Sequence, residues 1–247
     1  MRIAVLADLH ANIEAVEACL MHAHRARAER CVFLGDLVGY GADPGSVLDL
    51  VMAHVARGAL AVLGNHDEAA LAGPPERMDT DARAAAEWTR TQLTTAQRDF
   101  LAGLPLRVEE GGCLYVHANA WAPERWGYVQ GVQAAERSLR ATERRLTFCG
   151  HVHQPALYHL TPSGHAARFE PVPGTAIPLG SRRRWLAVPG SVGQSRDGNP
   201  AACYALFDDA AGVLTYYRVP YDHEAAAAKV LRAGLPPRLA SRLREGG

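Results

Sequence analysis

The sequence has almost no lysine and no excess of charge of either sign. Lys229 is the only lysine, so arginine supplies the rest of the 26 basic residues, which 26 acidic residues balance. A chain without a net positive field has no overall attraction for nucleic acid or for an anionic membrane surface. We therefore expect no membrane partner, and a nuclease activity is disfavoured because no run of basic residues suggests a binding groove.

Paired cysteines and long apolar runs are also missing. The five cysteines are odd in number and lack CxxC spacing, and most stand in apolar segments such as 31–34. This is typical of reduced core residues in a cytosolic protein. The first apolar run stops at Asp8, too early for a signal-peptide core, and no run approaches the roughly 18 apolar residues of a membrane span. We expect a cytoplasmic location.

What the chain does have is the composition of an ordinary globular protein. Of its 247 residues 48% are hydrophobic and 21% charged, which excludes disorder and coiled coil as the main architecture. The first half alternates apolar runs at 2–7, 31–34 and 59–63 with helical patterns at 13–28 and after Asp43-Pro44. Helices are also expected at 80–93, after the capping pair Thr94 and Gln97, and at 133–141.

The second half is richer in strand patterns than the first. These lie at 113–116, 145–149, 185–188, 202–207 and 213–219. No linker separates the halves, so we expect an α/β chain with one domain over 1–247. Residues 222–244 form two short helical patterns broken at Gly234 to Pro237, which we interpret as a packing appendage.

Metal-binding side chains begin where the apolar runs stop. They are Asp8 and His10, Asp36, Asn65 with His66 and Asp67, His117, and His151 with His153. In extended backbone residues i and i+2 point to the same side, so Asp8 with His10, and His151 with His153, can each aim at one point. Ligands of open α/β sheets bind beyond the carboxyl ends of strands.

This mixture of donors suits a pair of metal ions. Carboxylate and amide oxygens favour manganese, and imidazoles favour zinc, iron or nickel. Three oxygen donors and four histidines exceed what one ion needs, so two sites sharing a carboxylate are expected. A metal pair of this kind promotes displacement at phosphorus, which indicates phosphate-ester hydrolysis.

The ordered motifs DLH, GDLVG, GNHDE, VHA and GHVH resemble the calcineurin-like metallophosphoesterase superfamily. The later PGSVGQSRDGNP and AGLPPRLASRL are similar to its branch of small bacterial metallophosphatases. The resemblance implies a sandwich of two β-sheets flanked by helices, with a dimetal site on the loops at one edge.

The resemblance also assigns roles to these residues. It implies a first metal on Asp8, His10 and His153, a second on Asn65, His117 and His151, and Asp36 bridging the two. His66 would be the catalytic histidine, acting on the leaving oxygen while a metal-bridging hydroxide attacks phosphorus. Asp67 is a candidate to orient or charge-tune His66.

Substrate contacts are less determined by the motifs. Arg196 is a candidate to grip a phosphate, with an ion pair to Asp197 as the alternative. Asn12 is expected to cap the first helix and is also a candidate for substrate contact. Ser/Thr protein phosphatases of the superfamily carry an Asp-Arg pair where this chain has Gly39 and Tyr40, so Tyr40 takes its place as a candidate substrate residue.

The expected function is hydrolysis of a small phosphomonoester or phosphodiester, with nucleotides among the candidates. The alternatives are a non-catalytic metal-binding interaction protein on the same fold and a Ser/Thr protein phosphatase, which Gly39 and Tyr40 argue against. The expected cofactors are two divalent ions, manganese, iron, zinc or nickel, and the partner is a small phosphorylated substrate. A homo-oligomer is left open.

Overall fold

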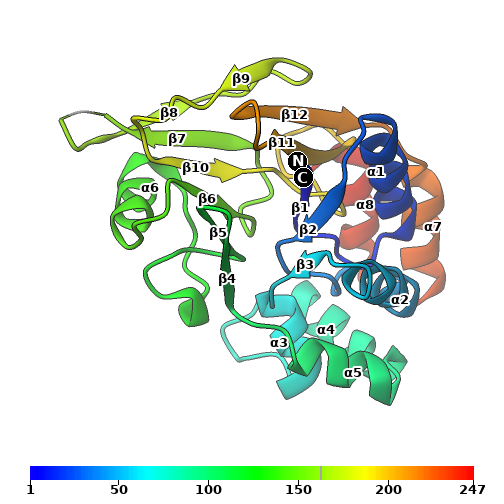
Figure 1. The fold of residues 1–247 in the computed structure, drawn as a ribbon. Helices are drawn as coiled ribbons and strands as arrows, with labels where there is room; N and C mark the ends of the chain where they lie inside the picture. Colours follow the sequence, from blue (N-terminus) through cyan, green and yellow to red (C-terminus); the bar gives the residue numbers. More distant parts are fainter. Residues whose placement is uncertain (162) are drawn as a thin grey trace.

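Two mixed β-sheets pack face to face in the computed structural model, which describes residues 1–161 and 163–247, and helices cover their outer sides (Figure 1). The first sheet has the order β3-β2-β1-β11-β12-β9. Its strands are β1 (Arg2–Leu6), β2 (Arg30–Phe33), β3 (Leu60–Ala61), β9 (Ala176–Pro178), β11 (Ala202–Asp208) and β12 (Val213–Val219). β1, β2 and β3 run parallel, and the others join antiparallel.

The second sheet has the order β4-β5-β6-β10-β7-β8. Its strands are β4 (Arg107–Glu110), β5 (Cys113–Val116), β6 (Leu146–Cys149), β7 (Ala156–Leu160), β8 (Ala166–Phe169) and β10 (Trp185–Val188). β5, β6 and β10 run parallel. The predicted two-sheet sandwich flanked by helices is therefore confirmed.

The helices lie outside this sandwich (Figure 1). They are α1 (Ile13–Arg25), α2 (Pro44–Val55), α3 (Asn65–Ala72), α4 (Thr80–Gln92), α5 (Thr95–Ala102), the 3-10 turn η1 (Pro123–Arg125), α6 (Gly131–Arg140), α7 (His223–Arg232) and α8 (Pro237–Glu245). Within the described chain no helix combines the length and the apolar character needed to cross a bilayer.

Strand β1 shows why the layers stack. Its residues alternate between two buried faces: Ile3 and Val5 join the core between the sheets, and Ala4 and Leu6 join the core under the helices. Because side chains alternate across a strand, an unbroken apolar run can serve both cores. The apolar run at residues 2–7 therefore forms, over Arg2–Leu6, a strand that is buried on both sides from Ile3 onward.

Several elements differ from the sequence-based expectations. The first helix ends at Arg25, not at residue 28, because Arg27 adopts a left-handed φ of 60. Helix α3 and strands β4, β7, β8 and β9 were not predicted. The strand expected at 59–63 pairs only over Leu60–Ala61, since beyond it the amide of Leu63 donates to Pro105.

The arrangement of strands positions one edge of the sandwich for binding. Loops leave the carboxyl ends of the parallel strands β1, β2 and β3 in one sheet and β5, β6 and β10 in the other. Carboxyl ends of parallel strands are the usual place for ligands in α/β proteins. All the candidate metal ligands follow one of these strands, as the next section describes.

Candidate functional site

The loops at this edge hold an unusual backbone. The non-glycine residues with positive φ in the described chain are, apart from Arg27, all in these loops, with φ between 46 and 69: Asp8, His10, Ala11, Asp36, Tyr40, Trp126, His151 and His153. A left-handed φ on such residues costs about 1–3 kcal/mol each and persists only where the surroundings enforce it. The concentration of strain marks this edge as the functional site.

A first group of donor atoms comes from the loops after β1, β2 and β6. Asp8, His10, Asp36 and His153 are all buried, and each places one donor atom within 4.8 Å of the others. The Nε2 atoms of His10 and His153 are 3.0 Å apart. Asp8 Oδ1 lies 3.6 Å from His153 Nε2, and Asp36 Oδ2 lies 3.7 Å from His10 Nε2.

A second group shares Asp36 with the first. Asp36, His117 and His151 are buried and their donor atoms also lie within 4.8 Å of one another. His117 Nε2 lies 3.1 Å from His151 Nδ1 and 3.3 Å from Asp36 Oδ2. Asn65 Oδ1 lies 3.0 Å from His117 Nε2, so the amide oxygen belongs to this group.

The positions of His151 and His153 differ from one expectation. The i, i+2 spacing predicted that both rings aim at one point, but His151 lies in the second group and His153 in the first. The reason is the backbone, since both residues are left-handed (φ 69 and 62) and the segment is not extended. Asp8 and His10, although also left-handed, do reach the same group.

Backbone carbonyls fix which ring nitrogens face inward. Nδ1 of His10 donates to Val38 O (3.2 Å) and Nδ1 of His153 donates to Gln194 O (2.5 Å). The two Nε2 lone pairs therefore face each other at 3.0 Å. Such an arrangement is repulsive unless a cation lies between the rings, so the donor set of the first group fits a metal ion.

The second group is arranged in the same way. His117 Nδ1 donates to Leu34 O (2.7 Å) and His151 Nε2 donates to Trp126 O (2.9 Å), which leaves their other nitrogens facing the group. With the carboxylate of Asp36 and the amide oxygen of Asn65, the atoms that converge here are acceptors. The second group therefore also fits a cation.

The pKa values of the acidic ligands and of His117 also bear on the binding of a cation. Burial raises the pKa of Asp8 to about 7. Burial also acts to raise the pKa of Asp36, but the imidazoles of His117 and His66 outweigh it and hold this pKa well below its usual range. The pKa of His117, which burial would lower, is raised to about 9 by Asp36, so positive charge is favoured between these two groups.

Unlike His117, the other three histidine ligands have lowered pKa values. Burial and the neighbouring His117 lower the pKa of His151 to about 3, and burial holds the pKa values of His10 and His153 well below their usual range. Neutral imidazoles are the form that binds metal ions. Three of the four histidine ligands, His10, His151 and His153, are therefore already in this form.

Two glycines allow the ligand loops to touch. A Cβ on Gly64 would lie 2.1 Å from the backbone nitrogen of Asp36 and 2.2 Å from its Oδ1. A Cβ on Gly35 would lie 2.7 Å from the backbone nitrogen of Gly64, and Gly35 also has a φ of 79. Only glycine fits such a close approach, so these motif positions serve the packing of the two loops.

His66 lies beside the first group of ligands. Its backbone N–H donates to Asp36 Oδ1 (2.8 Å), and its ring packs against Tyr40 with centroids 4.3 Å apart. The ring is buried, and this burial lowers the pKa of His66. Its Nδ1 is buried beside Gly39 without a hydrogen-bond partner in the described chain, while the ring lines a cavity where it can meet a bound molecule.

Asp67 does not contact His66 as the sequence had suggested. Its carboxylate is buried and accepts from the backbone N–H groups of Val38 (3.1 Å) and Gly64 (2.9 Å). It thereby caps helix α3 and ties the loop after β2 to the loop after β3. The physical reason is helix geometry: adjacent residues in the first turn of α3 point in different directions.

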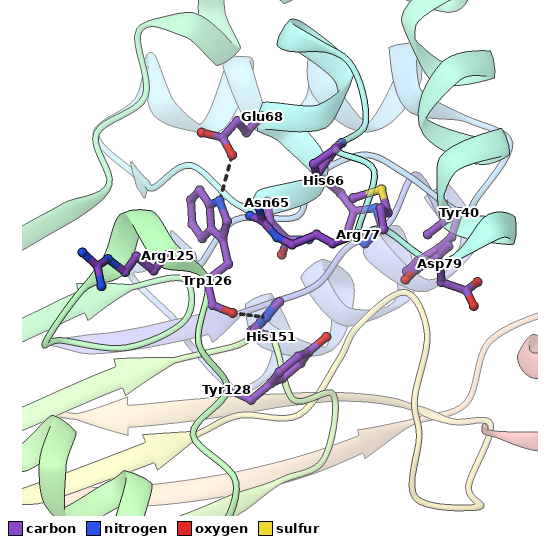
Figure 2. A pocket seen from close by; sticks show the side chains of 13 residues that line it. Tyr40, Asn65, His66, Glu68, Arg77, Asp79, Arg125, Trp126, Tyr128 and His151 are labelled. Atoms are coloured by element: carbon purple, nitrogen blue, oxygen red, sulfur yellow. Dashed lines mark hydrogen bonds between the residues drawn. The ribbon is translucent and has the colours of Figure 1, made fainter.

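A cavity of about 360 Å³ opens beside these residues. Figure 2 shows its walls: Asn65, His66, Glu68, Tyr40, Arg77, Asp79, Arg125, Trp126, Tyr128 and His151. Trp126 donates from Nε1 to Glu68 Oε2 (2.8 Å) and accepts from His151 through its carbonyl, as the dashed lines in the figure mark. This volume suits a small molecule.

Arg196 reaches this site from the loop after β10. Its Nη2 donates to the hydroxyl of Tyr40 (3.2 Å) and to Gln194 Oε1 (3.5 Å). The alternative ion pair with Asp197 is wrong, because Asp197 pairs with Arg218 instead. Arg196 and Tyr40 therefore lie together, as two of the predicted substrate residues.

Asn12 has a structural place. Its Oδ1 accepts from the N–H of Ala15 (3.2 Å), which confirms the predicted cap of α1. Its Nδ2 donates to Gly193 O (2.8 Å) and to the hydroxyl of Tyr221 (3.2 Å). Both amide hydrogens are thus engaged within the protein, and we interpret Asn12 as a part of the scaffold rather than as a substrate contact.

The sequence analysis did not single out several residues of the cavity. Arg77, Glu68 and Tyr128 line it, and of these only Glu68 belongs to a motif, as the last residue of GNHDE. None of the others belongs to a motif, because cavity walls need shape and charge and not a fixed spacing.

Comparisons with known proteins agree with this geometry. A model of the calcineurin-like phosphoesterase superfamily domain matches residues 1–211. The chain belongs to this superfamily. A buried Asp/His cluster that fits metal ions is therefore present on a metallophosphoesterase fold.

Individual relatives support the assignment along the whole chain. The chain is 32% identical over 246 residues to the uncharacterised protein MJ0912 of Methanocaldococcus jannaschii, covering 98% of this chain and 96% of the relative. A crystal structure of a metallophosphoesterase from Sphaerobacter thermophilus is 36% identical, with a TM-score of 0.89 and complete coverage of both chains. The hypothetical protein PH1004 of Pyrococcus horikoshii OT3, at 19% identity, shares the fold with a TM-score of 0.80 over 100% of this chain and 98% of that one.

Proposed function

We propose that this calcineurin-like phosphoesterase is a dinuclear metal-dependent hydrolase of a small phosphomonoester or phosphodiester. One observation carries the proposal: two groups of inward-facing acceptor atoms share the carboxylate of Asp36. A single ion does not satisfy both groups, because each already has a nearly complete donor set of its own.

The donors distribute between two ions as follows. Asp8, His10 and His153 would hold the first ion, Asn65, His117 and His151 the second, and Asp36 both. This mixture of oxygen and imidazole donors suits manganese, iron, zinc or nickel. Bound there, a metal pair would supply Lewis acidity toward the phosphoryl oxygens and would acidify water.

The protein's own side chains would do the rest of the work. His66 lines the cavity next to the ligand groups, so its ring can donate a hydrogen bond to the leaving oxygen. Arg196, held by Tyr40, can pair with a phosphoryl oxygen. Tyr40 thereby positions both groups, since its ring also packs on His66.

The size of the cavity supports a small substrate. At about 360 Å³ it holds a metabolite-sized ester rather than a folded phosphoprotein segment. The site also has Gly39 and Tyr40 where the superfamily's protein phosphatases have their Asp-Arg pair. We therefore propose a small phosphoester over a protein substrate.

A hydrolysis assay tests the proposal. The purified protein is freed of metal, reloaded with manganese, iron, zinc or nickel, and given a chromogenic phosphomonoester and a chromogenic phosphodiester. We expect turnover of at least one ester with at least one metal. His66→Gln should lower kcat by about 10²-fold to 10³-fold while keeping the bound metal.

A matched control separates chemistry from folding. His24→Gln changes an exposed histidine on α1 away from the site and should leave turnover as it is. Absence of turnover of both esters with every metal would overturn the proposal. Turnover that His66→Gln does not alter would refute the part assigned to His66.

A further inference from the structure

A second cavity of about 580 Å³ adjoins the first. The two share Tyr40, Asp79 and Tyr128 among their lining residues, so these side chains stand between neighbouring cavities. Helix α8 forms the far side of the second cavity. A molecule bound at the ligand cluster therefore has space to extend toward α8.

Three arginines line this second cavity. Arg196 comes from the loop after β10, and Arg238 and Arg242 come from α8. In the described chain none of the three has a carboxylate oxygen within 4.0 Å, whereas Arg244 on the same helix pairs with Glu224 at 2.8 Å. Asp79 and Glu245 also line the cavity but lie beyond that distance from these guanidinium groups.

The two arginines of α8 stand on one face of a fixed element. Arg238 and Arg242 are four residues apart, which places them one turn above each other. The adjoining side of α8 is anchored by Leu239 and Leu243, buried in a core shared with α7 and α4. Their guanidinium groups are therefore presented from a docked helix and not from a loose terminus.

An aromatic wall connects the two cavities. Tyr128 is 46% exposed and stacks on His151, with ring centroids 4.0 Å apart and an interplanar angle of 15°. Tyr40 lies across from it in the lining and holds Arg196 through its hydroxyl. The part of a ligand that passes between the cavities would thus lie against tyrosine.

We propose that the second cavity binds a second anionic group of the substrate, so that the substrate is a phosphoester carrying another phosphate or carboxylate on its alcohol part. Paired guanidinium groups without protein partners are the usual receptor for such an oxyanion. The inference rests on the proposed phosphoesterase function. Its two arginines on α8, Arg238 and Arg242, lie beyond the segment 1–211 matched by the superfamily model.

Matched substrates test this inference. The metal-loaded protein is given α,ω-alkanediol bisphosphates of increasing chain length, each beside the monophosphate of the same alkanediol. At the chain length that spans the two cavities, the bisphosphate should have a kcat/KM about tenfold to 100-fold above its monophosphate, through a lower KM. The Arg238→Gln/Arg242→Gln double variant should reduce this ratio toward one.

Arg244→Gln is the matched control, because it changes an arginine of the same helix that does not line the cavity. It should keep the ratio of the unaltered protein. Calorimetric titration of the manganese-loaded His66→Gln protein with the best bisphosphate should show the same loss of affinity when Arg238 and Arg242 are replaced.

The outcomes separate the two proposals. Turnover of the monophosphates with a ratio near one at every chain length, or a ratio that the double variant does not change, would overturn the second-anion inference alone. Failure to hydrolyse these esters together with both chromogenic esters would instead overturn the phosphoesterase function.

Discussion

The ligand cluster and the wall of the substrate cavities are built differently. In the cluster every aspartate and histidine ligand is buried, and backbone carbonyls hold the rings of His10, His117, His151 and His153 in place. In the wall, Arg238 and Tyr128 are exposed, and neither Arg238 nor Arg242 has a carboxylate oxygen within 4.0 Å in the described chain. The protein's own hydrogen bonds hold the first region, whereas these two arginines of the second have no ion pair to hold them.

From this difference we expect the cluster to determine metal binding and the wall to determine which ester is preferred. The cluster uses strained backbone at Asp8, Asp36 and His151, which only a rigid sandwich can enforce. The wall uses long side chains on helices packed at the edge. Substitutions in the cluster should therefore abolish binding of metal, and those in the wall should change which ester is preferred.

The largest effect is expected from Gly64→Ala. The added Cβ would meet backbone and carboxylate atoms of Asp36 at 2.1 and 2.2 Å, so the two ligand loops must separate. We expect a loss of about 3 kcal/mol or more in the free energy of unfolding, measured by urea denaturation, together with loss of bound metal.

Gly45→Ala is the control for that substitution. The nearest atoms to its added Cβ belong to the Gln97 side chain at 3.5 Å, and the residue lies in the first turn of α2. It should be neutral or slightly stabilising. Equal stability and metal content in both variants would refute the close-packed cluster.

A smaller effect is expected from Lys229→Met. Lys229 Nζ lies 2.5 Å from Glu14 Oε1 and 2.9 Å from Asp43 Oδ2, so it joins α7 to α1 and to the start of α2. Its removal leaves two partly buried carboxylates facing each other, which should cost about 1–3 kcal/mol. Thermal denaturation measures the change.

Two further variants test whether the effect of Lys229→Met comes from the lost ion pairs. Lys229→Arg should recover part of the stability, because it restores the charge with a different shape. Arg232→Met, at an exposed position on the same helix, should change little. A Lys229→Met protein as stable as the unaltered chain would show that this ion-pair network does not hold α7 in place.

The smallest effect is expected from Asn12→Ala, which removes the cap of α1. The free energy of unfolding should fall by about 1–2 kcal/mol, as for other caps, and KM should change less than a lost substrate contact would require. Asp222→Ala removes the corresponding cap of α7, whose Oδ1 accepts from Ala225 at 2.9 Å, and should cost a similar amount. A KM that rises tenfold in Asn12→Ala alone would make Asn12 a substrate residue after all.

Much of the cluster could be predicted because its residues follow strands. Asp8, Asp36 and His117 stand where apolar runs end, and the carboxyl ends of parallel strands meet at one edge. The division of His151 and His153 between two groups could not be derived from spacing, because left-handed backbone breaks the alternation that the i, i+2 argument assumes.

The parts of the fold that were missed have local causes. Helix α3 begins at Asn65, so its first turn consists of residues whose polar character indicates a loop. Strand β4 has the sequence Arg-Val-Glu-Glu and lies at the edge of its sheet, where apolar alternation is not required.

The substrate wall was the hardest part to predict. The interpretation of 222–244 as a packing appendage holds for Leu239 and Leu243, which are buried. It misses that the same helix turns Arg238 and Arg242 toward the site. A helix pattern shows which face is apolar, but not which cavity its polar face borders.

The count of metal ions per chain tests the central claim most directly. The protein is loaded with manganese, freed of excess metal by gel filtration, and analysed for elemental content beside Asp36→Asn. Two groups sharing Asp36 predict two ions per chain, falling to one or fewer in the variant. One ion in the unaltered protein, or two in both proteins, would contradict the shared-carboxylate site.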